Sequence, residues 1–239
     1  MGLGDHVVGV STYSRLPAGV TRPIVGDTLN IRVEPILAVK PDILLVQMDL
    51  SYFESLRRID PAINVEHFTI ETLDDVANSI EHMGSLVGQP ELGLTRKRAF
   101  LDKIDSLRSR TNSLNPVPTL FVLGYRGPSG PGADTFIDQM ITLAGGQNVL
   151  ADQFKGWHKP SLESIVKLAP AVIICQCKPE DAADAQAYWT RLDLRTPTPQ
   201  RVIVVTDDDW TLPADHLADY ASQLASFIHP ELKLMEPPQ

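Results

Sequence analysis

The chain has little of several features that would have classified it at once. Its 239 residues include only two cysteines, so no disulfide framework indicates a compartment. No apolar run reaches the roughly eighteen residues that a membrane-spanning helix needs, and Gly2–His6 has neither the basic start nor the apolar core of a secretory signal. Basic residues are outnumbered by acidic ones, 21 Lys and Arg against 30 Asp and Glu, so the net charge is −9. These deficits argue against disulfide scaffolds, direct membrane insertion and nucleic-acid binding, which usually needs a basic face.

The chain also lacks the motifs of common catalytic sites. Neither G-x-S-x-G, nor H-E-x-x-H, nor C-x-x-C occurs, and the six histidines are scattered. The Gly- and Pro-rich stretch Gly124–Gly132 follows an expected strand and precedes an expected helix, where nucleotide folds hold phosphate, yet it matches neither nucleotide-binding motif. The sequence therefore offers no catalytic residue. An enzyme acting on a nucleotide through residues 124–132 remains the alternative.

The two cysteines are close together in the chain. Cys175 and Cys177 end an expected strand, and residues two apart on a strand point to one face. A disulfide between them would be strained, and a metal site would need further ligands, with His158 the only nearby candidate. We interpret them as thiols of the core or of a pocket wall, with a metal site as the alternative.

What the sequence does contain is a repeat. Glu34–Gln47 and Glu163–Gln176 each consist of a short amphipathic helix, a proline break and a continuous apolar run of strand length. Such runs suit strands buried on both faces of a parallel sheet. A second matching pair, Gly4–Val8 and Gly146–Leu150, precedes the first in the same order, and strands are expected near residues 7–10 and 148–151. The repeat predicts two similar α/β lobes, each with a mostly parallel central sheet flanked by helices. Chance similarity of two βα-type units is the alternative.

A long charged helix is expected between the two copies. Residues 90–112 carry apolar side chains near one stripe at helical spacing, with charged residues on the other faces. Such a helix would span about 30 Å and lie across a surface. The expected domains are therefore a first lobe at residues 1–89, a spine helix at 90–115 and a second lobe at 116–239.

The two expected lobes differ in length. The second has a strand and a helix, within Pro118–Gly145, before its Gly146 motif, whereas nothing corresponds before Gly4. Internal symmetry therefore predicts that the first lobe lacks its first strand and helix, about thirty residues at usual element lengths. The expectation is a mis-set start or an amino-terminal truncation, and a truncated, non-transporting scaffold is a further alternative.

Aromatic residues follow several expected strands. Open α/β sheets bind ligands outside the carboxyl ends of their strands, so loops at these ends would face each other across a cleft between the lobes. Flat aromatic faces there could grip a bulky ligand with few polar contacts, although packing is the alternative for each ring. The candidate ligand-binding residues in these loops and strand ends are Tyr13, Gln47, Tyr125, Arg126, Trp157 and Trp210.

One acid stands at the start of each copy of the repeat. Glu34 and Glu163 lie early in equivalent helices, where the helix dipole stabilises a carboxylate. An ordinary helix-start acid is the simple interpretation of either one alone. As a pair, one per lobe, they could present two anionic groups to the arginines of a two-fold symmetric partner.

At these residues the chain resembles the substrate-binding proteins of ABC importers that have a helical spine and take up vitamin B12, ferric siderophores or haem. The segments that carry the resemblance are Gly2–Tyr13, Glu34–Gln47, Thr135-Phe136, Ala144–Asn148 and Ser161–Glu163. They are spread along nearly the whole chain in the family's order.

The resemblance implies a binding protein that is not an enzyme and carries no cofactor. It would clasp a metal chelate, first a corrinoid and otherwise a ferric siderophore or haem, with Tyr13, Trp157 and Trp210 lining the cleft. Glu34 and Glu163 would dock on arginines of a dimeric permease. The family is periplasmic or extracytoplasmic, although this chain shows no signal peptide.

Overall fold

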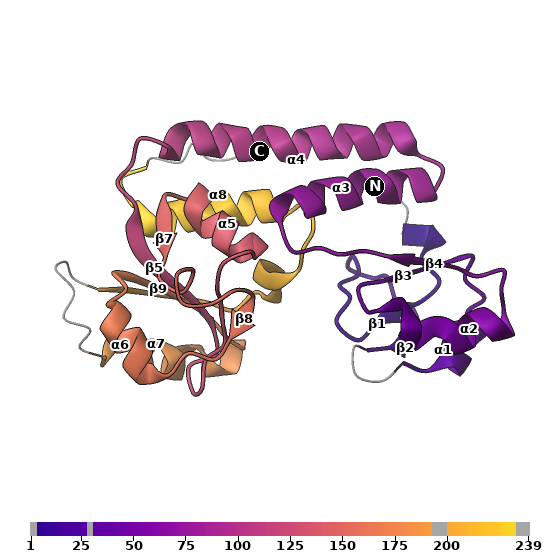
Figure 1. Cartoon of the computed structure of the whole chain (residues 1–239), viewed down its shortest axis with the longest axis horizontal. Coiled ribbons are helices and arrows are strands. Elements are labelled where there is room, and N and C mark those ends of the chain that lie inside the picture. The colour runs from indigo at the N-terminus through magenta and orange to yellow at the C-terminus, as the bar shows by residue number, and fades with distance from the viewer. Residues whose placement is uncertain (1–3, 28–30, 193–199, 233–239) are drawn as a thin grey trace. The chain divides into compact units, whose positions relative to one another are not determined.

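The computed structural model describes residues 4–27, 31–192 and 200–232. The chain forms two compact units, Met1–Ile70 and Glu71–Gln239, which are described separately below. Both are α/β, with their principal strands parallel (Figure 1). No described helix is both long enough and apolar enough to cross a membrane.

The second unit is built on one parallel sheet of four strands in the order β10-β9-β5-β7. The strands are β5 (Val117–Leu123), β7 (Gly146–Asn148), β9 (Val172–Gln176) and β10 (Arg201–Val205). The central strands β5 and β9 are uncharged and largely buried, because helices cover both faces of the sheet. The continuous apolar runs in the sequence predicted this arrangement.

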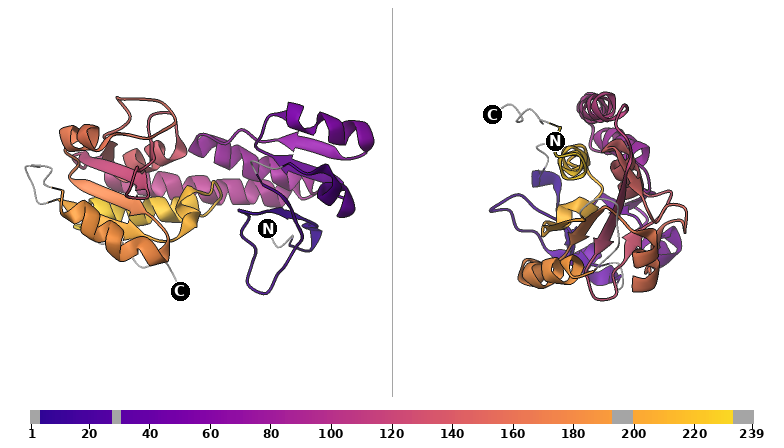
Figure 2. Two further views of the ribbon diagram at one scale, coloured as in Figure 1. Left: turned by 90° about the horizontal axis from the view of Figure 1, so that it is seen from below. Right: turned by 90° about the vertical axis from the view of Figure 1, so that its left-hand side faces the viewer.

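Helices lie on both sides of this sheet. The helices α6 (Leu162–Leu168) and α7 (Ala182–Thr190) cover one face, and α5 (Phe136–Leu143) and α8 (Leu217–Ile228) cover the other (Figures 1 and 2). On the α6–α7 side the core includes Ile165 and Trp189, both fully buried. The remaining short elements are β6 (Gly130–Pro131), β8 (Trp157–His158), η3 (Pro179–Asp181) and η4 (Asp208–Thr211).

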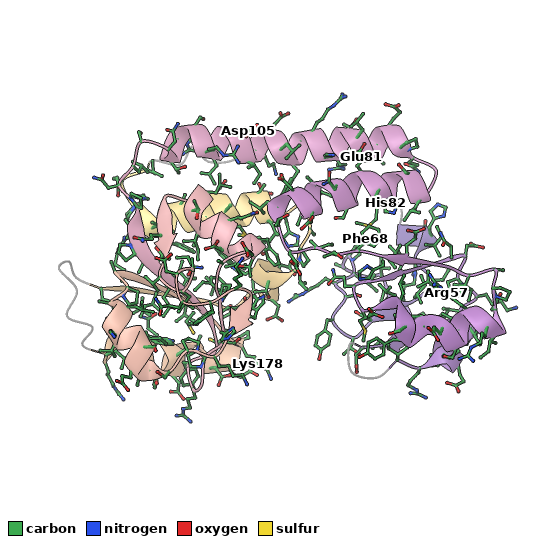
Figure 3. All side chains as sticks on the ribbon, in the orientation of Figure 1. Arg57, Phe68, Glu81, His82, Asp105 and Lys178 are labelled. Carbon is green, nitrogen blue, oxygen red and sulfur yellow. The ribbon has the colours of Figure 1, made fainter. Side chains whose placement is uncertain are left out.

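Two long helices pack side by side in the second unit. They are α3 (Leu73–Leu86) and α4 (Pro90–Thr111), and Figure 1 shows them running together. Thr72 begins α3 with the expected capping box, in which its hydroxyl accepts from the Asp75 N–H while the Asp75 carboxylate accepts from the Thr72 N–H. Glu81, labelled in Figure 3, accepts a hydrogen bond from Lys97 of α4 at 2.6 Å.

The two helices touch backbone to backbone at a pair of glycines. A Cβ added at Gly84 would lie 2.5 Å from the Gly93 Cα, and one at Gly93 would lie 2.9 Å from the Glu81 carbonyl oxygen. Neither neighbour is a flexible side-chain end that could move aside. Glycine at both positions therefore sets how closely α3 and α4 approach.

We predict that Gly84→Ala lowers the free energy of unfolding by about 2 kcal/mol, the usual cost of forcing an extra methyl into a packed contact. Urea denaturation followed by circular dichroism measures it. Ser85→Ala, at the exposed next position of α3, is the control and should change stability by less than about 0.5 kcal/mol. A neutral Gly84→Ala would show that the helices separate without cost.

The first unit has its parallel strands in two separate pairs. β1 (Val10–Ser11) pairs with β2 (Ile24–Gly26), and β3 (Ile43–Val46) pairs with β4 (Asn64–His67). The remaining elements are η1 (Gly4–His6), α1 (Val33–Ala38), η2 (Leu50–Phe53) and α2 (Glu54–Ile59). The core between these pieces includes Ile36, Phe53, Leu56 and Val65.

Several boundaries differ from those expected. The strand expected at residues 148–151 ends at Asn148, because the Asn148 side chain turns the backbone by accepting from the Leu150 N–H. Of the strand expected at residues 7–10, only Val10 lies in a strand, as the first residue of β1, and Gly4–His6 forms a 3₁₀ turn. The compact units divide after Ile70, since α3 packs on α4. The domain ranges 1–89, 90–115 and 116–239 stay predictions.

Candidate functional site

The helices α1 and α6 end in the same unusual backbone conformation. Lys40 and Ala169 have φ values of 49° and 46°, in the left-handed region that few non-glycine residues adopt. Each lies six residues after the acid of its helix and directly before a proline. One rare conformation at equivalent positions indicates that the repeat in the sequence is a repeat in local structure.

The acids of the repeat lie on the surface of their units. Glu34 and Glu163 occupy the first turns of α1 and α6, and both are exposed. Two residues further on, Ile36 and Ile165 are buried and fix each helix against its own unit. Among the described residues neither carboxylate has a hydrogen bond or an ion pair. Both acids are therefore available to a partner.

Trp157 lies on a short ribbon of the second unit. It belongs to β8, where it pairs antiparallel with Pro131 of β6, and its side chain is 41% exposed. The next residue, His158, stacks on Phe154 with ring centroids 4.4 Å apart. The ribbon therefore fixes the backbone at Trp157, and much of this residue stays open to solvent.

Tyr125 and Arg126 lie beside α7. The Arg126 guanidinium stands 5.3 Å from the centre of the Tyr125 ring, a cation–π arrangement. The Tyr125 ring meets the Tyr188 ring edge-on at 5.7 Å. Together with Asp184, Arg191 and neighbouring residues of α7 they line a pocket of about 270 Å³. Both candidates thus line one hollow of the second unit.

Trp210 lies in the interior. Only 2% of it is exposed, and its ring packs on Tyr220 at 4.7 Å and on Phe227 at 6.0 Å. These contacts favour the packing alternative for this residue. Its role as a ligand contact stays a prediction.

The candidates of the first unit are exposed. Tyr13 follows β1 and is 61% exposed, and Gln47 follows β3 on the surface. The repeat partner of Gln47 is Gln176, which the candidate set omitted. It is 5% exposed, donates to the Thr211 hydroxyl at 3.5 Å, and its side-chain carbonyl has no hydrogen bond within the described chain. Equivalence to Gln47 was the signal that could have identified it.

The loop at Gly124–Gly132 is not shaped as a phosphate cradle. The N–H groups of Gly124, Ser129 and Gly132 donate to the carbonyls of Gln176, Leu123 and Gly156. A Cβ on Gly132 would lie 2.1 Å from the Phe154 carbonyl oxygen, so this glycine permits a close backbone approach. Three N–H groups that could have met a phosphate are already used.

The cysteines lie at the end of β9. Cys175 is fully buried against Trp189, and burial raises the pKa of its thiol from an ordinary 9.0 to about 12. Burial also raises the pKa of Cys177. Within the described ranges, no three His, Cys, Asp or Glu residues are placed to hold a metal ion. The core interpretation is therefore favoured for Cys175.

We predict that Cys175 reacts about a thousandfold more slowly with iodoacetamide at pH 8 than an ordinary thiol. The thiolate is the reactive form, and a pKa near 12 leaves roughly one thiol in ten thousand ionised. Mass spectrometry of a Cys177→Ser variant measures it, with the urea-unfolded protein as control. Rapid labelling of the folded variant would contradict the burial of this thiol.

Comparison with known proteins places this chain in a family. A family model described as "Periplasmic binding protein" matches residues 1–192. The chain belongs to the periplasmic binding protein family. The expectations of a binding protein in place of an enzyme, with no cofactor of its own, are confirmed by this membership.

Individual relatives and solved structures agree with this family membership. The vitamin B12-binding protein of Yersinia pestis (strain Pestoides F) is 26% identical over 214 residues, which cover 87% of this chain and 73% of that protein. The periplasmic vitamin B12 binding protein BtuF of Vibrio cholerae has a TM-score of 0.79 at 23% identity, covering 98% of this chain and 92% of that one. The haem-binding protein RhuT from Roseiflexus sp. RS-1 has a TM-score of 0.79 at 21% identity, covering 96% and 92%.

These comparisons confirm the α/β fold class that the sequence predicted. Membership of the family also implies, at a coarse level, an ABC-transporter permease as partner and a chelate as ligand. The candidate ligand residues and the two docking acids stay predictions.

Proposed function

We propose that this chain is the substrate-binding protein of an ABC importer and works outside the cytoplasm. It binds a metal chelate, a corrinoid before a ferric siderophore or haem, and delivers it to the permease. The observation that carries this proposal is the match to vitamin B12-binding proteins over 87% of the chain. Haem-binding structures of the same fold support the wider class of bulky planar chelates.

Two exposed aromatic rings support the ligand class. Tyr13 in the first unit and Trp157 in the second are 61% and 41% exposed. A large apolar ring left open to water costs free energy that contact with a flat ligand would recover. We therefore assign these two rings to the ligand.

The surroundings of the two acids support the docking role. Leu162 and Val166 flank Glu163 on α6, and they are 41% and 40% exposed. Their repeat partners, Val33 and Leu37, flank Glu34 on α1 and are half-buried. A carboxylate beside apolar side chains that are at least partly exposed suits an arginine on an apolar surface, since a charge-assisted hydrogen bond is stronger away from water. We assign both acids to the permease interface.

Fluorescence titration tests the proposed function. Cyanocobalamin, haemin, a ferric siderophore and ATP are each added while tryptophan emission is followed, with N-acetyltryptophanamide correcting for absorption by the ligand. We expect saturable quenching by cobalamin, reduced in a Trp157→Phe variant. A response to ATP alone would favour the enzyme alternative, and no response to any chelate would contradict the proposal.

A further inference from the structure

The hollow of about 270 Å³ in the second unit has an arginine on each of its two walls. One wall is a stripe along α7 that includes Asp184, Tyr188 and Arg191, at positions i, i+4 and i+7 of one helix face. The other wall is the loop after β5, with Tyr125 and Arg126. The hollow therefore runs along a helix, with a loop on its far side.

The core of the unit holds both walls in place. The Tyr188 ring meets the Tyr125 ring edge-on at 5.7 Å and the Trp189 ring at 5.3 Å. Both tyrosines pack against the core cluster that contains Trp189. The Tyr125 ring in turn carries the Arg126 guanidinium, 5.3 Å from its centre. The hollow is therefore preformed, so a partner does not have to order it on binding.

The two guanidinium groups are open to a partner. Arg126 and Arg191 are both exposed, and among residues 4–27, 31–192 and 200–232 neither side chain has a hydrogen bond or an ion pair. Asp184 does not neutralise Arg191, because seven residues separate them, about 10 Å along a helix axis. Two uncompensated cations on one hollow favour an anion, and a planar guanidinium binds a carboxylate through two parallel hydrogen bonds.

The course of α7 argues against the chelate as the source of this anion. α7 connects the parallel strands β9 and β10, so it begins at their carboxyl ends, where such sheets bind ligands, and runs back toward their amino ends. The Arg191 end of the hollow therefore lies away from the ligand end of the sheet. It shares its side of the sheet with α6, which carries Glu163 (Figure 1).

We propose that this hollow binds an acidic side chain of the permease, whose carboxylate pairs with Arg126 and Arg191. The proposal rests on the proposed function, because it extends the permease interface beyond Glu163, and it moves Arg126 from the predicted ligand residues to the permease contacts. This chain supplies the anion at Glu163 and the cations at the hollow. Two contacts of opposite sign on one side of the unit fix the orientation of docking, since a wrong orientation brings like charges together.

Binding to the permease tests this proposal. The permease is held in nanodiscs of phosphatidylcholine, which has no net charge, and its affinity for the chelate-loaded protein is measured by biolayer interferometry. We expect Arg191→Glu to weaken the complex at least about tenfold. Arg191→Lys keeps the charge but loses the paired hydrogen bonds, so it should weaken the complex less. Arg110→Glu is the matched control, since Arg110 is exposed in the last turn of α4, and it should bind normally.

A charge exchange identifies the partner residue. Acidic residues in the outward-facing loops of the permease are changed to lysine one at a time, and one of these variants should bind Arg191→Glu better than it binds the parent chain. The absence of any such variant would overturn the proposal, as would equal binding by Arg191→Glu and Arg110→Glu.

Two further controls separate the permease from other sources of an anion. All three protein variants should bind the chelate within twofold of the parent chain, and loss of chelate affinity in Arg191→Glu would overturn the proposal. Binding of the parent chain to empty nanodiscs of phosphatidylglycerol that Arg191→Glu loses would also overturn it, because the anion would then be a lipid phosphate. A parent chain that does not bind the permease would contradict the proposed function, and this inference with it.

Discussion

Reversing the charge of the two acids proposed to dock on the permease, with Glu34→Lys and Glu163→Lys together, is expected to reduce cobalamin uptake at least a hundredfold. Each acid is exposed and has no partner among the described residues, so the change costs the isolated protein little. A hydrogen bond to a charged group contributes about 1.5–3 kcal/mol, so losing two of them and adding repulsion removes most of the docking affinity. Uptake of radiolabelled cobalamin by cells that carry the importer measures the effect.

The matched control moves the same charge elsewhere. Glu54 and Glu180 are exposed acids at the starts of α2 and η3, so Glu54→Lys with Glu180→Lys changes the net charge equally. This control should transport normally, and both double variants should bind the chelate within twofold of the parent chain. Loss of chelate affinity in the Glu34 and Glu163 variant would contradict a docking role, as would equal loss of uptake in the control.

The two tryptophans proposed from the sequence are expected to behave oppositely when each is replaced by alanine. Trp210→Ala removes a ring that is 2% exposed and should lower the free energy of unfolding by about 3–5 kcal/mol. Trp157→Ala removes a ring that is 41% exposed, so stability should change by less than about 1 kcal/mol. Chelate affinity should fall about tenfold or more in Trp157→Ala, because ring contacts are worth about 1 kcal/mol beyond the area they bury.

Urea denaturation and fluorescence titration separate the two effects. Phenylalanine at each position is the conservative variant, and Trp157→Phe should regain part of the lost affinity. If Trp157→Ala binds the chelate unchanged, Trp157 is not a ligand residue. If Trp210→Ala is as stable as the parent, the contacts with Tyr220 and Phe227 do not support the core.

The sequence predicted those elements whose pattern is local. The apolar run at β9 and the capping box at Thr72 were both recognisable without a structure. The repeat predicted equivalent helices at Glu34 and Glu163, and the structure adds the shared left-handed residues at their ends. Each of these patterns lies within a short stretch of the chain, so the sequence alone is sufficient to predict the element that it forms.

Features that depend on distant neighbours could not be predicted in this way. The position of Trp210 after a strand predicts a ligand contact, and the sequence does not indicate that Phe121 and Phe227 pack against its ring. Similarly, the Gly4–His6 motif matches a strand and forms a turn, because strand formation requires a partner that the motif does not specify.

The most direct test of the account is to ask which metal the protein retains. The purified chain is incubated with equimolar cyanocobalamin, haemin and a ferric siderophore, passed through gel filtration, and analysed for cobalt and iron by mass spectrometry. The account predicts close to one cobalt per chain and little iron, with cobalt reduced in Trp157→Ala. A protein that emerges with neither metal would contradict the claim that it carries a metal chelate.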